Sequence, residues 1–400
     1  MKRFIFGVYL LLVLVATLQS YFGHSTTFNN LEYTSYNNYI IFKQSFFHLI
    51  GNKDLYILYP SEHWDLYKYS PTFALLMAPL AMLPDVMGLF FWNMLNVFVL
   101  FFGVKKIAQV HESSMASVIG NAKKQDDSVL HSRRKKFGVS LSILLFIIFE
   151  LLTSIQNEQS NALIAGLIIF AFFLLEKDKV WLATLCIVLT VYIKIFGIVA
   201  FALFLVYPQK KKFITSSIFW MLLLGVLPMA VVGVEQMQFL YESWWRMLRQ
   251  DEAVSAGFSV MGWLSTWFGL EVSGNVIVLL GVILFCLPLL KIKRYSDFDF
   301  RWRLLASILI WVVIFNHKAE SPTYIIAMSG VAIWYFFNEK NKWNTILVVF
   351  AFVFTSLSPT DLFPRYLREN LVIPYTLKAV PCIFIWGKII WEMLFENNSD

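Results

Sequence analysis

Charge is scarce in this chain of 400 residues, because only 15% of them are Asp, Glu, Lys or Arg whereas 58% are hydrophobic. A soluble domain normally carries about 25% charged residues. This shortage excludes an ordinary soluble protein and predicts apolar helices that cross a membrane. The 39 Phe and 14 Trp fit surfaces that face lipid and its interfaces.

Cysteine and the common cofactor motifs are also scarce. The chain has three cysteines, Cys186, Cys286 and Cys382, each inside an apolar run and none at a metal-ligand spacing. We expect small buried residues rather than disulfides or ligands. There is no Gly-rich phosphate loop, His-x-x-x-His pair or nucleophile elbow. We therefore expect no metal, no cofactor and no ATP-binding domain, so that an activated substrate supplies the energy of any reaction.

The net charge of +7 does not indicate nucleic-acid binding, because the basic residues collect in short loops between apolar runs. Residues 105–137 hold eight Lys and Arg and predict a poorly ordered basic cytoplasmic loop. Residues 22–70 hold few, which predicts an outward loop. We expect one transmembrane domain over residues 1–400, in the cell (inner) membrane and with its site facing outward.

The apolar runs predict an all-α, polytopic fold. They lie near 4–21, 71–104, 138–154, 161–175, 180–207, 213–233, 274–290, 302–316, 322–337, 343–357 and 373–392. Since a crossing needs about 20 apolar residues, we expect about 11–13 transmembrane helices, some of them short or broken. The run 180–207 begins and ends beside lysines, so it predicts two short helices with Lys194 near an outward bend. No internal repeat is visible, which argues against an inverted-repeat transporter.

The outward loop 22–70 carries the candidate chemistry. Its apolar positions over 38–50 have helical spacing, and Gly51 stands where a helix would end. We expect an interfacial helix, either as a cover over a lipid-level site or as ordinary packing. Asp65 and Tyr69 flank the entry to the next apolar run. The aromatic residues there are either an interfacial belt or a platform for a sugar, and Asp65 could take a proton from an acceptor hydroxyl.

Three polar sites interrupt the apolar runs farther along the chain. Gln159 and Asn161 lie in an outward turn, and Glu150 lies just before that turn. Lys194 either snorkels to the surface or holds a lipid phosphate as a point charge. His317 and Lys318 share one tight turn with Glu320, Ser321 and Pro322, which is either solvated or part of the same site.

In their order and spacing these residues resemble glycosyltransferase family 87, a branch of the membrane-embedded C fold (GT-C). The resemblance runs to about residue 340. It rests on Gly51 with Leu55-Tyr56, Tyr69-Ser70-Pro71, Pro79-Leu80-Ala81-Met82-Leu83-Pro84, Trp92 and Asn96, Glu158-Gln159-Ser160-Asn161, Lys194, and His317 with Ser321-Pro322. The family has Gly where Glu158 stands. It also has a presumed catalytic Asp where this chain has Asn38, which cannot take a proton at neutral pH.

The resemblance implies an inverting hexosyltransferase that resembles mannosyltransferases. A polyprenyl-phosphate-linked sugar would be the donor, and a lipid or glycan hydroxyl the acceptor. Lys194 or Lys318 would hold the donor phosphate, together with His317, Gln159, Asn161 and Tyr69. Since Asn38 replaces the family's acid, either Asp65 or Glu32 would be the base, or the chemistry would differ from that of the family. A non-enzymatic lipid or polysaccharide transporter and a surface-glycan polymerase or ligase remain as alternatives.

Overall fold

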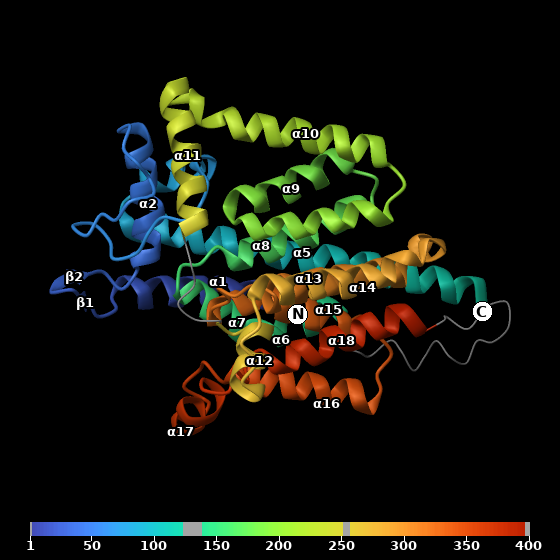
Figure 1. Ribbon diagram of the computed structural model, residues 1–400. Helices are drawn as coiled ribbons and strands as arrows, with labels where there is room; N and C mark the ends of the chain where they lie inside the picture. Colours follow the sequence, from blue (N-terminus) through green and yellow to red (C-terminus); the bar gives the residue numbers. More distant parts are fainter. Residues whose placement is uncertain (1, 123–137, 251–256, 397–400) are drawn as a thin grey trace.

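The computed structural model describes residues 2–122, 138–250 and 257–396 as a bundle of helices with a single small hairpin (Figure 1). The first half contains α1 (Lys2–Tyr21), β1 (Thr26–Phe28), β2 (Leu31–Tyr33), α2 (Asn37–Ile50), α3 (Pro71–Leu76), α4 (Ala78–Ala81), α5 (Asp85–Ala122), α6 (Val139–Phe146), α7 (Ile148–Gln156), α8 (Asn161–Leu175), α9 (Val180–Ile193) and the 3₁₀ helix η1 (Ile195–Val206). This all-α architecture is that of a polytopic membrane protein, as the composition predicts.

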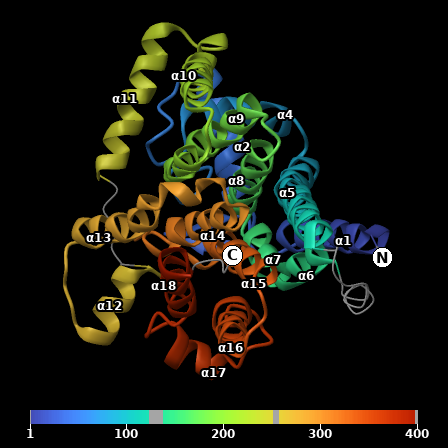
Figure 2. The ribbon, with the colours of Figure 1, turned by 90° about the vertical axis from the view of Figure 1, so that its right-hand side faces the viewer.

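The second half continues the bundle and adds short 3₁₀ and π turns. Its elements are α10 (Lys210–Val226), η2 (Leu227–Ala230), α11 (Val234–Gln250), α12 (Val260–Phe268), α13 (Gly274–Cys286), η3 (Leu287–Leu290), η4 (Ile292–Ser296), α14 (Phe298–Ile314), η5 (Ser321–Thr323), α15 (Tyr324–Phe337), α16 (Lys342–Ala351), π-helical η6 (Phe352–Leu357), α17 (Arg365–Leu367), π-helical η7 (Arg368–Val372) and α18 (Val380–Phe395). Seen from the side of the C-terminus, α14 and α8 lie near the middle of the bundle (Figure 2).

Three helices of the described chain are long and apolar enough to cross a membrane unaided: Phe4–Tyr21, Asp85–Ala116 and Lys210–Ala230. The pair α6 and α7, bent by 47° at Ile147, makes a fourth if it forms one span. Further apolar helices of 10–17 residues, among them α8, α9 and η1, are shorter. The expected count of about 11–13 crossings stays a prediction, because these short elements do not by length alone define a crossing.

One end of the bundle carries the elements that lie outside the parallel helices. The β1–β2 hairpin, α2 and α11 gather there, and α2 and α11 run across the direction of the long helices (Figure 1). We call this the hairpin end; the C-terminus and the far end of α5 lie at the other. The helix predicted over 38–50 is α2, and it ends at Gly51, whose N–H bonds to the carbonyls of Leu49 and Phe47.

The predicted interruption at Lys194 is present, and local chemistry explains it. Lys194 leaves α9 with extended torsions (φ −140°, ψ 125°), and the chain returns along α9 as η1. Gly197 permits this close return, since a Cβ there would lie 2.7 Å from the carbonyl carbon of Thr190. A second close contact joins α8 to α5, where a Cβ at Gly166 would lie 2.5 Å from the Leu100 nitrogen. Neither position has room for a larger residue without a backbone shift.

The basic segment differs from its prediction over its first half. Residues 105–122 continue helix α5 rather than forming a loop. The reason is helical spacing, because Val104, Ile107, Ala108 and His111 stay buried on one face. No glycine or proline interrupts residues 104–119. The remainder of the predicted loop, 123–137, lies outside the described residues.

Candidate functional site

The site is built around Lys194 at the break between α9 and η1. Its Nζ donates to Gln159 Oε1 at 3.1 Å and to Asn161 Oδ1 at 3.0 Å. It also lies 5.7 Å from the ring centroid of Tyr69 and 5.8 Å from that of Phe196. Amide oxygens and aromatic faces stabilise the cation without neutralising it. No carboxylate is bonded to the ammonium within the described residues, so its charge can attract an anion.

The turn that carries Gln159 and Asn161 has a strained residue at its centre. Glu158 has φ +48°, in the left-handed region that glycine occupies at little cost. Its side chain is buried, and its Oε1 accepts a 2.7 Å hydrogen bond from Ser20 Oγ. Its carbonyl accepts a 2.7 Å bond from Trp92 Nε1. Bonds from α1 and α5 thus hold the turn in the shape that presents two amides to Lys194.

Burial of Glu158 predicts a measurable pH dependence of stability. Desolvation raises the pKa of this carboxyl from 4.5 to about 8, against the opposing effect of the Ser20 hydrogen bond. The raised pKa means that the fold favours the protonated acid. Stability is therefore full below about pH 4.5 and falls by about 1.4 kcal/mol per pH unit as the pH rises toward 8.

We expect Glu158→Gln to remove this dependence. The test is the melting temperature of detergent-solubilised protein from pH 4.5 to 8, with Glu235→Gln as an exposed control. The wild type and the control should lose stability as the pH rises, while Glu158→Gln changes less. Equal slopes in all three proteins would contradict the assignment.

Tyr69 connects Lys194 to the outward loop. The following residue, Ser70, donates from its Oγ to the Tyr192 carbonyl at 2.6 Å, which joins the loop directly to the end of α9. Burial raises the pKa of Tyr69, and the negative charges of Glu320 and Asp65 act in the same direction. Burial lowers the pKa of Lys194 to about 8, the charge of Glu320 opposes this shift, and that of Lys68 adds to it. The charges of Glu320 and Asp65 therefore both act on Tyr69.

The turn at residues 316–320 is held from two sides. The Lys318 N–H donates to Asn316 Oδ1 at 3.0 Å within the turn. The Phe258 N–H donates to the Ala319 carbonyl at 3.0 Å, and Tyr324 Oη donates to the Phe258 carbonyl at 2.7 Å. The next element, η5, packs against α7, which leads into the turn that holds Lys194. His317 is exposed in this turn.

The remaining predicted site residues differ in whether they contact the residues around Lys194. Asn38, on α2, donates from Nδ2 to the Asn157 carbonyl at 2.9 Å, so it touches the turn that carries Gln159. Glu32 is exposed in the β1–β2 hairpin and accepts a hydrogen bond from Ser25. Within the described residues, no hydrogen bond or ion pair connects Glu32 with Lys194. The structure thus joins Lys194, Gln159, Asn161 and Tyr69 by contacts, and Asp65 by its charge.

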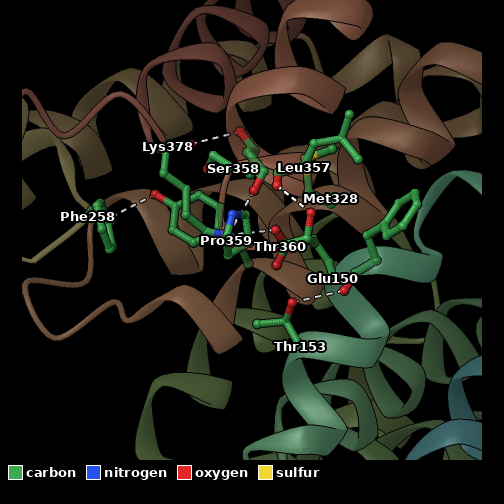
Figure 3. A network of polar contacts seen from close by, with 12 residues as sticks. Glu150, Thr153, Phe258, Met328, Leu357, Ser358, Pro359, Thr360 and Lys378 are labelled. Atoms are coloured by element: carbon green, nitrogen blue, oxygen red, sulfur yellow. Dashed lines mark hydrogen bonds and ion pairs between the residues drawn. The ribbon is translucent and has the colours of Figure 1, made fainter. Parts of the chain in front are cut away.

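A buried ion pair lies beneath the hairpin end of the bundle. Of its two residues, the sequence analysis named only Glu150. Lys378 Nζ donates to Glu150 Oε1 at 2.6 Å and to the Thr355 carbonyl at 2.8 Å, and both charged side chains are at most 2% exposed. Figure 3 shows the pair within a network of polar contacts that includes Phe258. Lys378 Nζ also lies 5.2 Å from the ring of Tyr324, which bonds to Phe258. Lys378 lies inside the last apolar run, and a charge there is the one sequence signal of such a pair. Its partner, Glu150, is 228 residues away in the chain.

This arrangement suits a reaction on an anionic substrate near the membrane. A charged ammonium, two amide side chains and an aromatic ring meet at one point, and the charges of Asp65 and Glu320 act on that ring. Such groups can hold a phosphate, contact a sugar and accept a proton. Among the described residues, no group of three or more His, Cys, Asp or Glu is placed to hold a metal ion.

Comparison with known proteins agrees with this chemistry. No curated protein sequence matches the chain. A family model described as "Glycosyltransferase family 87" matches residues 67–315, more than half of the chain. The matched region includes Tyr69, Gln159, Asn161 and Lys194, and it ends just before the turn that contains Glu320. The chain belongs to glycosyltransferase family 87 and is a membrane glycosyltransferase.

Proposed function

We propose that this enzyme moves a sugar, mannose or a similar hexose, from a polyprenyl-phosphate donor to a hydroxyl of a lipid or glycan acceptor. The observation that carries the proposal is the half-buried Lys194 ammonium, bound by Gln159 and Asn161 and stacked near Tyr69. A lipid-linked phosphate is an anion that enters from the membrane. A cation at the break of an apolar helix pair is placed to meet it.

The chemistry assigns a role to each group. The acceptor oxygen attacks the anomeric carbon, and the bond from that carbon to the phosphate oxygen breaks with inversion. Lys194 stabilises the charge that grows on the leaving phosphate, and Lys318 and His317 would support it from the neighbouring turn. Tyr69 would contact the sugar. A carboxylate takes the acceptor proton, and Asp65 and Glu32 are the candidates in the loop, while Asn38 would bind rather than deprotonate.

The proposed orientation places the hairpin end outside the cell, in the inner membrane. Its support is the charge bias, since Lys177, Lys179, Lys210, Lys211 and Lys212 flank the two ends of α9 and η1 that lie away from Lys194. Basic residues concentrate on the cytoplasmic side of membrane proteins. Lys194 and the 22–70 loop then face outward.

The test uses purified protein in vesicles with radiolabelled polyprenyl-phosphate mannose and, in parallel, glucose and galactose donors. Label should move to a lipid or glycan acceptor and the anomeric configuration should invert. The size of the product separates single transfer from polymerisation or block ligation. Movement of the intact donor across the bilayer with no glycosidic product, for every donor and acceptor tried, would favour a transporter and contradict the proposal.

A further inference from the structure

Two buried polar residues of α5, Trp92 and Asn96, share one face of that helix. Trp92 is 1% exposed and Asn96 is 0% exposed. They lie four residues apart, and Asn96 Nδ2 donates to the Trp92 carbonyl at 3.0 Å. Residues at this spacing lie one above the other on a helix. Polar groups buried this deeply need hydrogen-bond partners, and both residues find further partners on the segment that leads into α8.

Trp92 and Asn96 bond to the two ends of this one short segment. Trp92 Nε1 donates to the Glu158 carbonyl at 2.7 Å. The Leu163 N–H donates to Asn96 Oδ1 at 3.0 Å. Both contacts are made to backbone atoms of the segment. The two side chains of α5 therefore fix the path of the backbone over residues 158–163.

The segment 158–163 carries the two amides that bind the Lys194 ammonium. Gln159 Oε1 lies 3.1 Å and Asn161 Oδ1 lies 3.0 Å from Lys194 Nζ. Asn161 is also the first residue of α8. Because these amide side chains are short, a shift of the segment relative to α5 would carry both oxygens away from the ammonium.

The start of α8 takes its capping bond from α5. The first N–H groups of a helix have no partner within it. Among the residues that the structure describes, Ser160 at the N-cap makes no capping bond with its own side chain, whereas Asn96 accepts the Leu163 N–H. The two helices lie side by side (Figure 1). Their close contact at Gly166, where a Cβ would lie 2.5 Å from the Leu100 nitrogen, fixes their register one turn farther on.

We propose that Trp92 and Asn96 are positioning residues of the phosphate-binding site, acting on the Lys194 ammonium through the segment 158–163. This inference rests on the proposed function, in which Lys194 binds the donor phosphate. The two side chains of α5 set the positions of the amide oxygens, and the amide oxygens set the position of the ammonium. A lysine has a flexible stem and a compact charge, so its location depends on the groups that bind it. A misplacement of about 1 Å can lower a reaction rate by about 10²-fold.

The experiment measures the affinity for a radiolabelled short-chain polyprenyl phosphate in detergent micelles, and the kcat of transfer. Trp92→Phe removes the N–H donor, and Asn96→Leu replaces the amide by methyl groups. Each should weaken phosphate binding by about 5- to 30-fold, as expected when a buried hydrogen bond is lost. Each should also lower kcat by about 10- to 100-fold. Asn96→Asp keeps an acceptor for the Leu163 N–H and should recover part of both losses.

Asn93 supplies the matched control on the same helix. It is fully buried, but its Nδ2 donates to Thr17 Oγ1 on α1, at 3.2 Å, instead of to the segment before α8. Asn93→Leu should lower the melting temperature about as much as Asn96→Leu does. Its affinity for polyprenyl phosphate should stay within twofold of wild type, because a destabilised protein loses active molecules whereas those that remain folded keep their affinity.

A double-mutant cycle with Lys194→Met tests whether the effect passes through the ammonium. With Lys194 present, Asn96→Leu should weaken binding by the full factor. In the Lys194→Met protein the same change should weaken it by less than twofold further, because no ammonium remains to be positioned. Trp92→Phe is the milder change, and the same cycle is measured with it if Asn96→Leu does not fold.

The outcomes separate this inference from the proposed function. A wild type that binds no polyprenyl phosphate overturns both. A wild type that binds it but transfers no sugar overturns the proposed transfer alone, and coupling in the cycle still supports the positioning role. Affinities of Trp92→Phe and Asn96→Leu within twofold of wild type overturn the positioning role. An equal loss from Asn96→Leu with and without Lys194 overturns it as well.

Discussion

Lys194→Met should weaken binding of a short-chain polyprenyl phosphate by about 10- to 150-fold, the equivalent of the 1.5–3 kcal/mol typical of a hydrogen bond to a charged group. The loss follows from the position of Lys194, whose ammonium is bound, among the residues that the structure describes, by the neutral oxygens of Gln159 and Asn161 and lies near aromatic rings. It is measured by titrating the phosphate while following intrinsic fluorescence. Transfer should fall by more, about 10²–10³-fold, because the leaving-group charge grows in the transition state.

Two further variants distinguish the loss of phosphate binding from a general destabilisation of the protein. Lys194→Arg keeps the charge and should retain an affinity between those of wild type and Lys194→Met, since a guanidinium cannot reproduce the point contact of an ammonium. Lys53→Met removes an exposed lysine of the same end and should bind within twofold of wild type. An affinity of Lys194→Met within twofold of wild type, in folded protein, would remove Lys194 from the phosphate site.

The second large effect concerns stability. Lys378→Met should lower the free energy of unfolding by about 3–5 kcal/mol, because it leaves the Glu150 carboxylate buried without its counter-ion. The other carboxylate oxygen of Glu150 already lacks a hydrogen-bond partner within the described structure. The Thr355 carbonyl loses a donor as well. Unfolding in mixed detergent micelles measures the difference.

The matched control is Lys342→Met, an exposed lysine whose loss should change stability by less than about 0.5 kcal/mol. The double variant Glu150→Leu with Lys378→Met should recover most of the stability lost by Lys378→Met, since an apolar pair needs no counter-ion. If Lys378→Met were as stable as Lys342→Met, the stabilising role assigned to the ion pair would be contradicted. Failure of the double variant to recover would assign the loss to the Thr355 contact instead.

The parts of the fold that depend on nearby residues could be predicted from the sequence. Helix α2 follows from apolar spacing and a terminal glycine, and the break at Lys194 follows from a charge inside an apolar run between two basic flanks. Each of these two signals involves residues that are close together in the sequence. The fold class follows from composition. The roles of Lys194, Asp65 and the other site residues stay predictions until the substrates are bound.

The parts that depend on distant residues could not be predicted. No pattern in the sequence pairs Glu150 with Lys378 across 228 positions. The partners of Asp65 depend on which side chains meet at the hairpin end. The continuation of α5 through residues 105–122 differs from the predicted loop because a segment with few large apolar residues still forms a helix when those residues share one face.

The short helices around Lys194 have a consequence for the lipid itself. At 1.5 Å per residue the 14 residues of α9 extend about 21 Å, and the 12 residues of η1, at 2.0 Å each, extend about 24 Å. A typical hydrocarbon layer is about 30 Å thick, so both legs are shorter than the bilayer. If both legs cross the bilayer, as the proposed orientation requires, this hydrophobic mismatch would thin the lipid beside them. Lys194 would then lie close to the depth of the proposed donor's headgroup, and the isoprenoid tail would not need to leave the acyl layer for its phosphate to be bound.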